Sequence, residues 1–251
     1  MPGIAWIIGG GSGIGAAVAR RLAAIGWTVA ISGRRAEKLT EVAGASEAIR
    51  PYPLDVTDQD AVSTTIGKIA AELGRIDIAL FGAAAWQPMD VGDYDFGAFA
   101  KIVDTNLLGV VRLANPLIAQ FDRQGGGQLA VIASVAGYVG LPRAAAYGAT
   151  KAALINLCEA MRTELAPKNI FVRMIAPGFV KSELTDKNDF PMPFLMETDD
   201  AARRIVDGLT GSTRFEIAFP RRMVWLMKTL RFLPYPLFFA ITRRMLPERL
   251  R

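Results

Sequence analysis

Tyr147 and Lys151 lie four residues apart, and side chains at that spacing share one face of a helix. A phenol has an ordinary pKa of about 10, so it exchanges protons near pH 7 only where positive charge stabilises its phenolate. A lysine one helical turn away can supply that charge. Taken alone, such a pair is more often a packed tyrosine and a solvated lysine, so its function depends on the rest of the chain.

The composition of the 251-residue chain excludes several other kinds of site. It contains no histidine, which rules out a Ser-His-Asp hydrolase, a Cys-His protease and a histidine-ligated metal. The single cysteine, Cys158, permits neither an internal disulfide nor a cysteine-rich zinc site, and we expect no metal site. A strand-like apolar run begins at Ile4, so we expect no signal peptide and a cytoplasmic protein.

Short apolar runs alternate with longer segments of helical periodicity. The runs predict strands at 4–8, 28–32, 50–54, 76–81, 128–133, 171–175 and 215–219. Helical spacing covers 13–25, 58–73, 96–121 and 147–165. This alternation predicts an α/β protein with a parallel sheet of about seven strands and helices on both faces. We expect one domain over residues 1–220 and a helical extension of it over 221–251.

A glycine-rich turn joins the first predicted strand to the first helix in "IIGGGSGIGAAVARRL". Its glycines follow a G-x-x-x-G-x-G spacing. Glycine permits a tight turn and lets the backbone approach a pyrophosphate, whose charge then lies at the helix N-terminus. The sequence therefore predicts a Rossmann-type doubly wound fold that binds a dinucleotide. The expected contacts in this turn are Gly9, Gly11, Ser12, Gly13, Ile14 and Gly15.

The end of the second predicted strand indicates which dinucleotide is bound. An NAD site usually has a carboxylate there, which accepts hydrogen bonds from the ribose 2′-OH. This chain has Gly33 followed by Arg34 and Arg35. A guanidinium can bind a 2′-phosphate through paired donors, although two arginines can also simply begin a solvated helix. On charge complementarity we expect NADP(H) in preference to NAD(H).

An ordered set of residues resembles the short-chain dehydrogenase/reductase family over about residues 3–210. The set comprises Gly9, Gly13, Gly15, Asp55, Val56, Asn106, Ser134, Tyr147, Lys151, Pro177 and Gly178. The spacing also matches, because Ser134 lies 13 residues before Tyr147. The resemblance implies an oxidoreductase that interconverts a carbonyl and an alcohol with a nicotinamide cofactor.

By this resemblance, Asn106, Ser134, Tyr147 and Lys151 form a catalytic tetrad. Tyr147 is the acid/base, Lys151 activates it and binds the nicotinamide ribose, and Ser134 polarises the substrate oxygen. Asn106 holds a water that passes protons toward Lys151. Further cofactor contacts are expected at Asp55, Val56, Gly82, Ala83, Pro177, Gly178, Val180 and Ser182.

Two departures from the family pattern affect the cofactor wall. Ile8 stands where the family usually has a threonine, and Phe81-Gly82-Ala83-Ala84 replaces its usual Asn-Asn-Ala-Gly. The small residues still leave room for a cofactor. The complete tetrad favours an enzyme, but two alternatives stay open: a regulatory protein that binds the cofactor without turnover, and an isomerase or epimerase on the same fold.

The segment of about 182–198 is expected to form a lid over the nicotinamide. Its apolar residues, together with Trp86, favour an apolar carbonyl or alcohol as substrate, although ordinary packing explains them equally well. The predicted helices 96–121 and 147–165 carry apolar residues on more than one face. By the resemblance, they pair with their copies in a homo-oligomer, either a dimer or a tetramer.

The C-terminal part of the chain is basic. Residues 201–251 contain 11 Lys or Arg against 3 Asp or Glu, and nothing indicates a nucleic-acid-binding fold. Pro234 and Pro236 predict two short helices in the tail, whose longest uncharged stretch of 11 residues is too short to span a bilayer. The tail therefore either makes peripheral contact with an anionic membrane or packs on protein.

Overall fold

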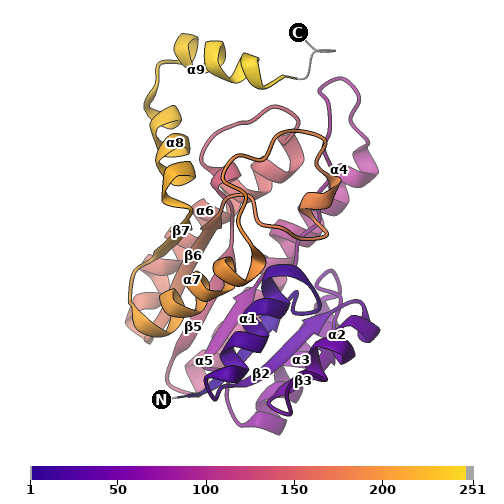
Figure 1. Cartoon of the computed structure of the whole chain (residues 1–251). Helices are drawn as coiled ribbons and strands as arrows, with labels where there is room; N and C mark the ends of the chain where they lie inside the picture. Colours follow the sequence, from indigo (N-terminus) through magenta and orange to yellow (C-terminus); the bar gives the residue numbers. More distant parts are fainter. Residues whose placement is uncertain (1, 247–251) are drawn as a thin grey trace.

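A parallel sheet of seven strands lies at the centre of the computed structural model, which describes residues 2–246 (Figure 1). The strands are β1 (Ile4–Ile8), β2 (Thr28–Gly33), β3 (Ile49–Pro53), β4 (Ile78–Phe81), β5 (Gly127–Ile132), β6 (Ile170–Pro177) and β7 (Glu216–Phe219). Their order is β3-β2-β1-β4-β5-β6-β7, so the direction of winding reverses between β1 and β4. This order confirms the predicted doubly wound fold.

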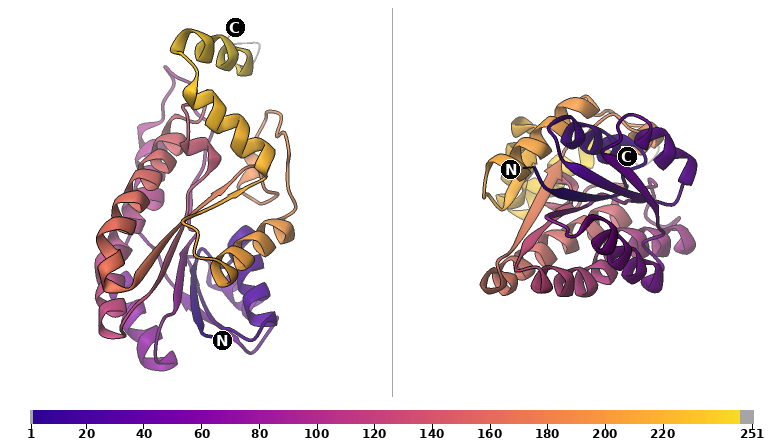
Figure 2. Two further views of the ribbon diagram at one scale, coloured as in Figure 1. Left: turned by 90° about the vertical axis from the view of Figure 1, so that its left-hand side faces the viewer. Right: turned by 90° about the horizontal axis from the view of Figure 1, so that it is seen from below.

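Helices cover both faces of the sheet (Figure 2). On one face, α1 (Gly13–Ala24), α2 (Ala36–Ala43) and α7 (Thr198–Gly211) bury their apolar sides. On the other, α3 (Gln59–Leu73), α5 (Gly109–Arg123) and α6 (Ala145–Leu165) do the same. Strands covered on both sides need apolar residues at successive positions, which is why β1 reads IAWII and β4 reads IALF.

The predicted helix over 96–121 is divided in the structure. It consists of α4 (Phe96–Val103), a π-helical turn (Asp104–Leu108) and α5. The apolar periodicity continues through the wider turn, so the sequence pattern did not reveal it; such turns often occur at functional sites. Together Phe96–Arg123 is long and apolar enough to cross a membrane by length and composition, but α5 buries its apolar side in the core.

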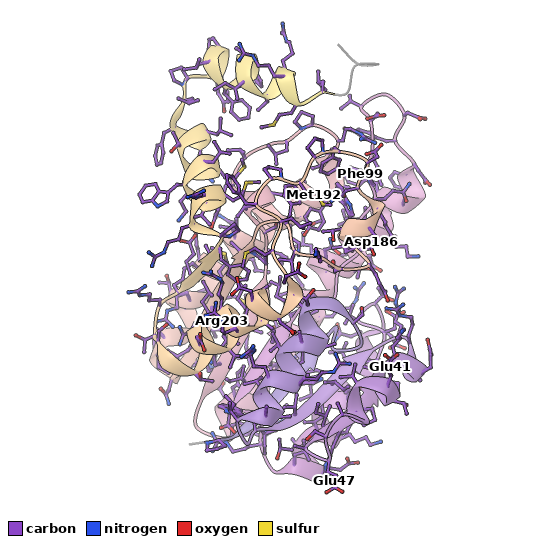
Figure 3. All side chains as sticks on the ribbon, viewed as in Figure 1. Glu41, Glu47, Phe99, Asp186, Met192 and Arg203 are labelled. Carbon is purple, nitrogen blue, oxygen red and sulfur yellow. The ribbon has the colours of Figure 1, made fainter. Side chains whose placement is uncertain are left out.

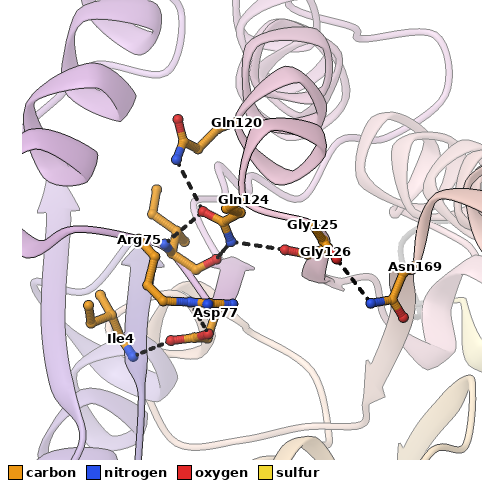
Figure 4. A network of polar contacts seen from close by, with 9 residues as sticks. Ile4, Arg75, Asp77, Gln120, Gln124, Gly125, Gly126 and Asn169 are labelled. Atoms are coloured by element: carbon orange, nitrogen blue, oxygen red, sulfur yellow. Dashed lines mark hydrogen bonds and ion pairs between the residues drawn. The ribbon is translucent and has the colours of Figure 1, made fainter.

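Polar side chains hold the amino ends of the central strands (Figure 4). The Asp77 carboxylate accepts a hydrogen bond of 2.8 Å from the backbone N–H of Ile4 and pairs with Arg75 at 2.6 Å. The Gln124 amide donates to the carbonyl of Ile76 at 2.6 Å and accepts from its N–H at 3.2 Å. The backbone of Ile76 is therefore hydrogen-bonded to a side chain instead of to a neighbouring strand. The strand β4 begins at Ile78, two residues later than predicted.

Within its described residues, 221–246, the tail forms two short α-helices, as the prolines predict: α8 (Arg221–Phe232) and α9 (Tyr235–Thr242). Both extend beyond the carboxyl end of the sheet, where they form an arm that Figures 1 and 2 show in yellow. Met223, Met227 and Leu230 on one side of α8 are buried in the core cluster that includes α6. The arm is therefore anchored to the domain by a narrow apolar face.

Candidate active site

A cleft of about 660 Å³ opens at the carboxyl ends of the central strands. Its walls come from the glycine-rich turn after β1, the end of β2, the loop after β4, the ends of β5 and β6, and α6. This is the position where the winding of the sheet reverses, and open α/β sheets bind their ligands in the crevice at that point.

The glycine-rich turn has a shape that side chains would prevent. Gly9 has a φ of +88°, and a Cβ on it would lie 2.6 Å from the backbone nitrogen of Ala83. A Cβ on Gly15 would lie 2.2 Å from the carbonyl oxygen of Gly9. Because glycine has no Cβ at these two positions, the backbone of the turn can lie close to the loop after β4 and to the start of α1. This cradle suits a pyrophosphate at the helix N-terminus, and the residues present therefore fit a dinucleotide.

Most of the predicted cofactor and catalytic residues meet in this cleft. Those that line it are Gly9, Gly11, Ser12, Gly13, Ile14, Gly15, Arg34, Arg35, Val56, Gly82, Ala83, Ser134, Tyr147, Lys151, Pro177, Gly178, Val180 and Ser182. Asp55 and Asn106 are not among its lining residues. The Asp55 carboxylate instead accepts hydrogen bonds from the Thr57 backbone N–H at 3.0 Å and from the Thr57 hydroxyl at 2.8 Å, so it shapes the turn after β3.

Tyr147 and Lys151 lie on adjacent turns of α6. The Lys151 Nζ atom is 5.2 Å from the centroid of the Tyr147 ring and donates a hydrogen bond of 2.7 Å to the carbonyl of Ile132. Burial lowers the pKa of Lys151 to about 7. Burial also raises the pKa of Tyr147 to about 12, against the opposing effect of a hydrogen bond with Ser134. Near pH 7 the phenol therefore keeps its proton, whereas the lysine can gain or lose one.

Ser134 follows the end of β5, on the cleft side of Tyr147. Its hydroxyl donates to the carbonyl of Pro177 at 3.3 Å and accepts from the backbone N–H of Ala136 at 3.1 Å. The hydroxyl is thereby fixed beside the phenol. Trp86 packs edge-on against the Tyr147 ring, with the two ring centroids 5.1 Å apart.

Asn106 occupies the π-helical turn and is fully buried. Its side-chain oxygen accepts from the N–H of Ala85 at 2.7 Å, and its amide donates to the Ala85 carbonyl at 3.0 Å and to the Thr150 hydroxyl at 3.3 Å. The side chain therefore fastens the loop after β4 to α6. Its expected role in holding a water stays a prediction.

The segment between β6 and α7, predicted as the lid, crosses the carboxyl side of the sheet. Within it, the Phe190 ring packs against Phe179 with centroids 6.1 Å apart. Arg143 pairs with Asp90 at 3.0 Å and with Asp189 at 2.5 Å, so it connects the loop after β4 to the lid. Met192 of the lid and Phe99 of α4 both lie in the region between the sheet and α9 (Figure 3).

Four lining residues were not singled out from the sequence: Leu54, Thr105, Ile132 and Ala133. The lining also includes Ile8, Gly33 and Ala84, whose identities were discussed for the cofactor wall, and Glu183, Leu184, Thr185 and Lys187 of the predicted lid. Glu183 lies beside the arginine pair at the end of β2. Its carboxylate pairs with Arg35 at 2.7 Å, and Arg35 also donates to the Ser12 hydroxyl at 3.2 Å. Glu183 is 148 residues from Arg35, so no local pattern marks this ion pair.

Comparison with known proteins places this geometry in a family. A family model described as short chain dehydrogenase matches residues 3–191. An uncharacterized oxidoreductase of Myxococcus xanthus is 36% identical over 245 residues, which cover 96% of each chain.

Solved structures show the same fold. A short-chain dehydrogenase from Streptomyces avermitilis superposes with a TM-score of 0.82 at 23% identity over 97% of each chain. A 3-ketoacyl-(acyl-carrier-protein) reductase from Brucella melitensis, complexed with NADH, has a TM-score of 0.79 at 25% identity, covering 86% of this chain and 94% of its own. With the glycine-rich turn and the Tyr147/Lys151 pair meeting in one cleft, these matches establish that the chain belongs to the short-chain dehydrogenase/reductase family of oxidoreductases.

Proposed function

We propose that this protein interconverts a carbonyl and an alcohol with NADP(H), and that Tyr147 transfers the proton. One observation carries the proposal: Ser134, Tyr147 and Lys151 line the same cleft as the glycine-rich turn. A dinucleotide held by the turn would lie in the cleft whose wall carries the acid/base pair. Such an arrangement suits a reaction in which hydride and proton are transferred at neighbouring atoms.

A bound nicotinamide would supply the hydride for reduction, or accept it in the reverse direction. The protein handles the proton. Tyr147 donates its hydroxyl proton to the substrate oxygen as negative charge develops there, and its raised pKa of about 12 keeps it protonated until then. Ser134 donates a hydrogen bond to the same oxygen, and protonated Lys151 stabilises the phenolate that remains. Asn106 acts through the loop after β4 and is a positioning residue.

Preference for NADP(H) is supported by the charges near the end of β2. Arg34 and Arg35 line the cleft, and Gly33 replaces the carboxylate of an NAD site. Arg35 is engaged by Glu183, so Arg34 is the arginine we assign to the 2′-phosphate. The Brucella neighbour is complexed with NADH, which supports a nicotinamide cofactor in this fold without deciding the phosphate.

An apolar substrate is supported by the residues beside Tyr147. Trp86 packs on the Tyr147 ring itself, and Phe179 and Phe190 form an aromatic pair at the lid. These rings favour a carbonyl or alcohol flanked by hydrocarbon over a sugar, which would need more hydrogen-bonding partners.

The test is NADPH oxidation by the purified protein with a panel of aliphatic and aromatic carbonyls. Tyr147→Phe should lower turnover by about 10²–10⁴-fold while cofactor affinity changes little. Tyr138→Phe is the matched control, because its buried hydroxyl binds Glu216 at 2.6 Å, away from the cleft lining. A loss below threefold for Tyr147→Phe would contradict the assignment.

The same assay separates the alternatives. A regulatory protein would bind NADPH but consume none with any carbonyl. An isomerase or epimerase would convert substrate with no net consumption of cofactor, which product analysis would detect.

We also infer a homodimer formed through α5 and α6. Leu108, at the end of the π-helical turn, and Val111, in the first turn of α5, are exposed apolar residues, whereas the opposite face of α5 packs against the core. Light scattering at micromolar concentration should give twice the chain mass, and Val111→Glu should reduce it toward one chain. A wild-type mass of 27.1 kDa would contradict the dimer.

A further inference from the structure

The arm of α8 and α9 exposes large apolar side chains to solvent. Figure 3 shows ring side chains standing outward from both helices. The exposed fractions are 71% for Trp225, 85% for Phe232, 75% for Tyr235, 50% for Leu237 and 53% for Phe239. Leu226, at 44%, is exposed as well. Single exposed apolar residues are common on proteins, but six within fifteen positions form a patch that indicates an interaction surface.

The exposed rings are not needed to hold the arm in place. On α8, Met223, Met227 and Leu230 already provide the inner face and are at most 4% exposed. Phe238 and Ile241 of the second helix are partly buried against the same cluster. Trp225 and Phe232 are seven positions apart, so they share the opposite side of α8. The arm therefore has two apolar faces, of which only one is used by the fold.

The positive charge of the arm indicates what kind of partner it can bind. Residues 221–246 contain six Lys or Arg and no Asp or Glu. Lys228 pairs with Glu216 at 2.6 Å, but Arg221, Arg222 and Arg243 are exposed beside the rings. A second copy of the arm would bring like charges together. An anionic lipid surface complements both features, since rings enter the boundary of the acyl chains and arginines meet the headgroups.

The dimensions of the arm indicate contact with one leaflet. The eight residues of α9 extend about 12 Å, far less than the roughly 30 Å of a hydrocarbon core. Both helices lie on the side of the sheet where the lid crosses the cleft (Figure 1). Docking through the arm would thus turn the cleft side of the molecule toward the lipid.

We propose that α8 and α9 dock this protein on the surface of anionic bilayers, with Trp225 and Phe232 in the acyl boundary. The test is sedimentation of the full chain with vesicles, without substrate or cofactor, so it is independent of the proposed enzymatic function. Vesicles of phosphatidylglycerol and phosphatidylcholine should bind the protein, and binding should weaken with salt. Vesicles of phosphatidylcholine alone should bind at least tenfold less.

Variants assign the binding to the two features of the arm. Trp225→Ser with Phe232→Ser should weaken binding at least tenfold, and Arg221→Gln with Arg222→Gln by about fivefold for each charge. Two control variants carry matched changes at exposed residues in the amino-terminal half: Ile25→Ser, and Arg20→Gln with Arg50→Gln. Both controls should bind as the unchanged protein does. Circular dichroism and thermal unfolding should show all variants folded, because the inner face of α8 is unchanged.

Three outcomes would overturn the proposal. The first is no binding, or equal binding to neutral and anionic vesicles. The second is an equal loss of binding in the controls. The third is a self-associated form that Trp225→Ser with Phe232→Ser dissociates while vesicle binding is absent, which would assign the patch to a second copy of the chain.

Discussion

The cleft and the arm both lie at the carboxyl end of the sheet, yet the cleft region buries polar side chains and the arm exposes apolar ones. In the cleft region, polar groups are buried: Asn106 and Lys151 are 0% and 2% exposed. In the arm, rings as large as Trp225 and Phe232 face solvent. Burying a polar group and exposing an apolar ring both cost free energy. Lys151 is buried in the wall of the cleft, where a ligand can reach it, whereas the exposed rings of the arm are not needed by the fold and mark a surface that can interact with a partner.

The two regions also differ in how the cost is offset. Each buried polar group of the site has partners within the chain: Asn106 binds Ala85 and Thr150, and Lys151 binds the Ile132 carbonyl. Among the rings of the arm, Tyr235 stacks on Phe239 with ring centroids 5.7 Å apart, and Phe239 meets the partly buried Phe238 edge-on at 5.3 Å. The site is therefore complete within the chain except for its ligands, whereas the arm lacks a surface to cover it.

The largest effect on stability should come from the inner face of the arm. Met227→Ala removes a side chain that is 1% exposed, so it should lower the free energy of unfolding by about 2–5 kcal/mol. Phe232→Ala, on the outer face, should change it by less than about 0.5 kcal/mol. Urea unfolding of both variants measures the difference. Equal losses would mean that the outer ring belongs to the core and that the two faces do not differ.

The buried lysine should make stability depend on pH. Because burial lowers its pKa from 10.5 to about 7, the unfolded chain binds the proton that the folded chain lacks between these values. Stability should therefore rise with pH in this window, by about 1.4 kcal/mol per pH unit, and this contribution is lost as the pH falls toward 7. Between pH 7.5 and 9.5 the unchanged protein should gain about 2–3 kcal/mol more than Lys151→Met does. Parallel slopes would show that Lys151 stays charged when folded.

We expect Arg34, and not Arg35, to bind the 2′-phosphate of the cofactor. Arg34→Ala should weaken NADPH binding by about 1.5–3 kcal/mol and NADH binding much less, because only NADPH carries the 2′-phosphate. Calorimetric titration of both cofactors measures this. Equal losses for both would remove Arg34 from phosphate recognition.

The smallest effect should come from Glu183, which is exposed and holds Arg35 by an ion pair of 2.7 Å. Glu183→Gln should free Arg35 and strengthen NADPH binding by less than about 1 kcal/mol, as is typical of surface ion pairs. NADH binding should not change. A loss of NADPH affinity would show instead that the pair itself shapes the site.

Local sequence patterns predicted the seven strands, several of the helices and the glycine-rich turn of the cleft, but not α2 or α7. Apolar runs of strand length and helical periodicity depend on neighbouring residues, and so does the glycine spacing at Gly9, Gly13 and Gly15. The i, i+4 spacing of Tyr147 and Lys151 likewise follows from helix geometry alone. For this reason the doubly wound fold was predicted and is confirmed. Ser134 was expected from the family resemblance, and the structure places it with Tyr147 and Lys151 in the lining of one cleft.

Only the tertiary structure decided features that depend on distant residues. Asn106 binds Ala85, 21 positions away, and Glu183 meets Arg35 across 148 positions. The Asp55 carboxylate does not line the cleft, because it accepts hydrogen bonds from the backbone N–H and the hydroxyl of Thr57 in its own loop. The tail sequence combined aromatics and arginines, but which of them face solvent depended on the fit of α8 against the core. Contacts between residues that are distant in the sequence depend on the path of the whole backbone, and the periodicity of apolar residues does not predict them.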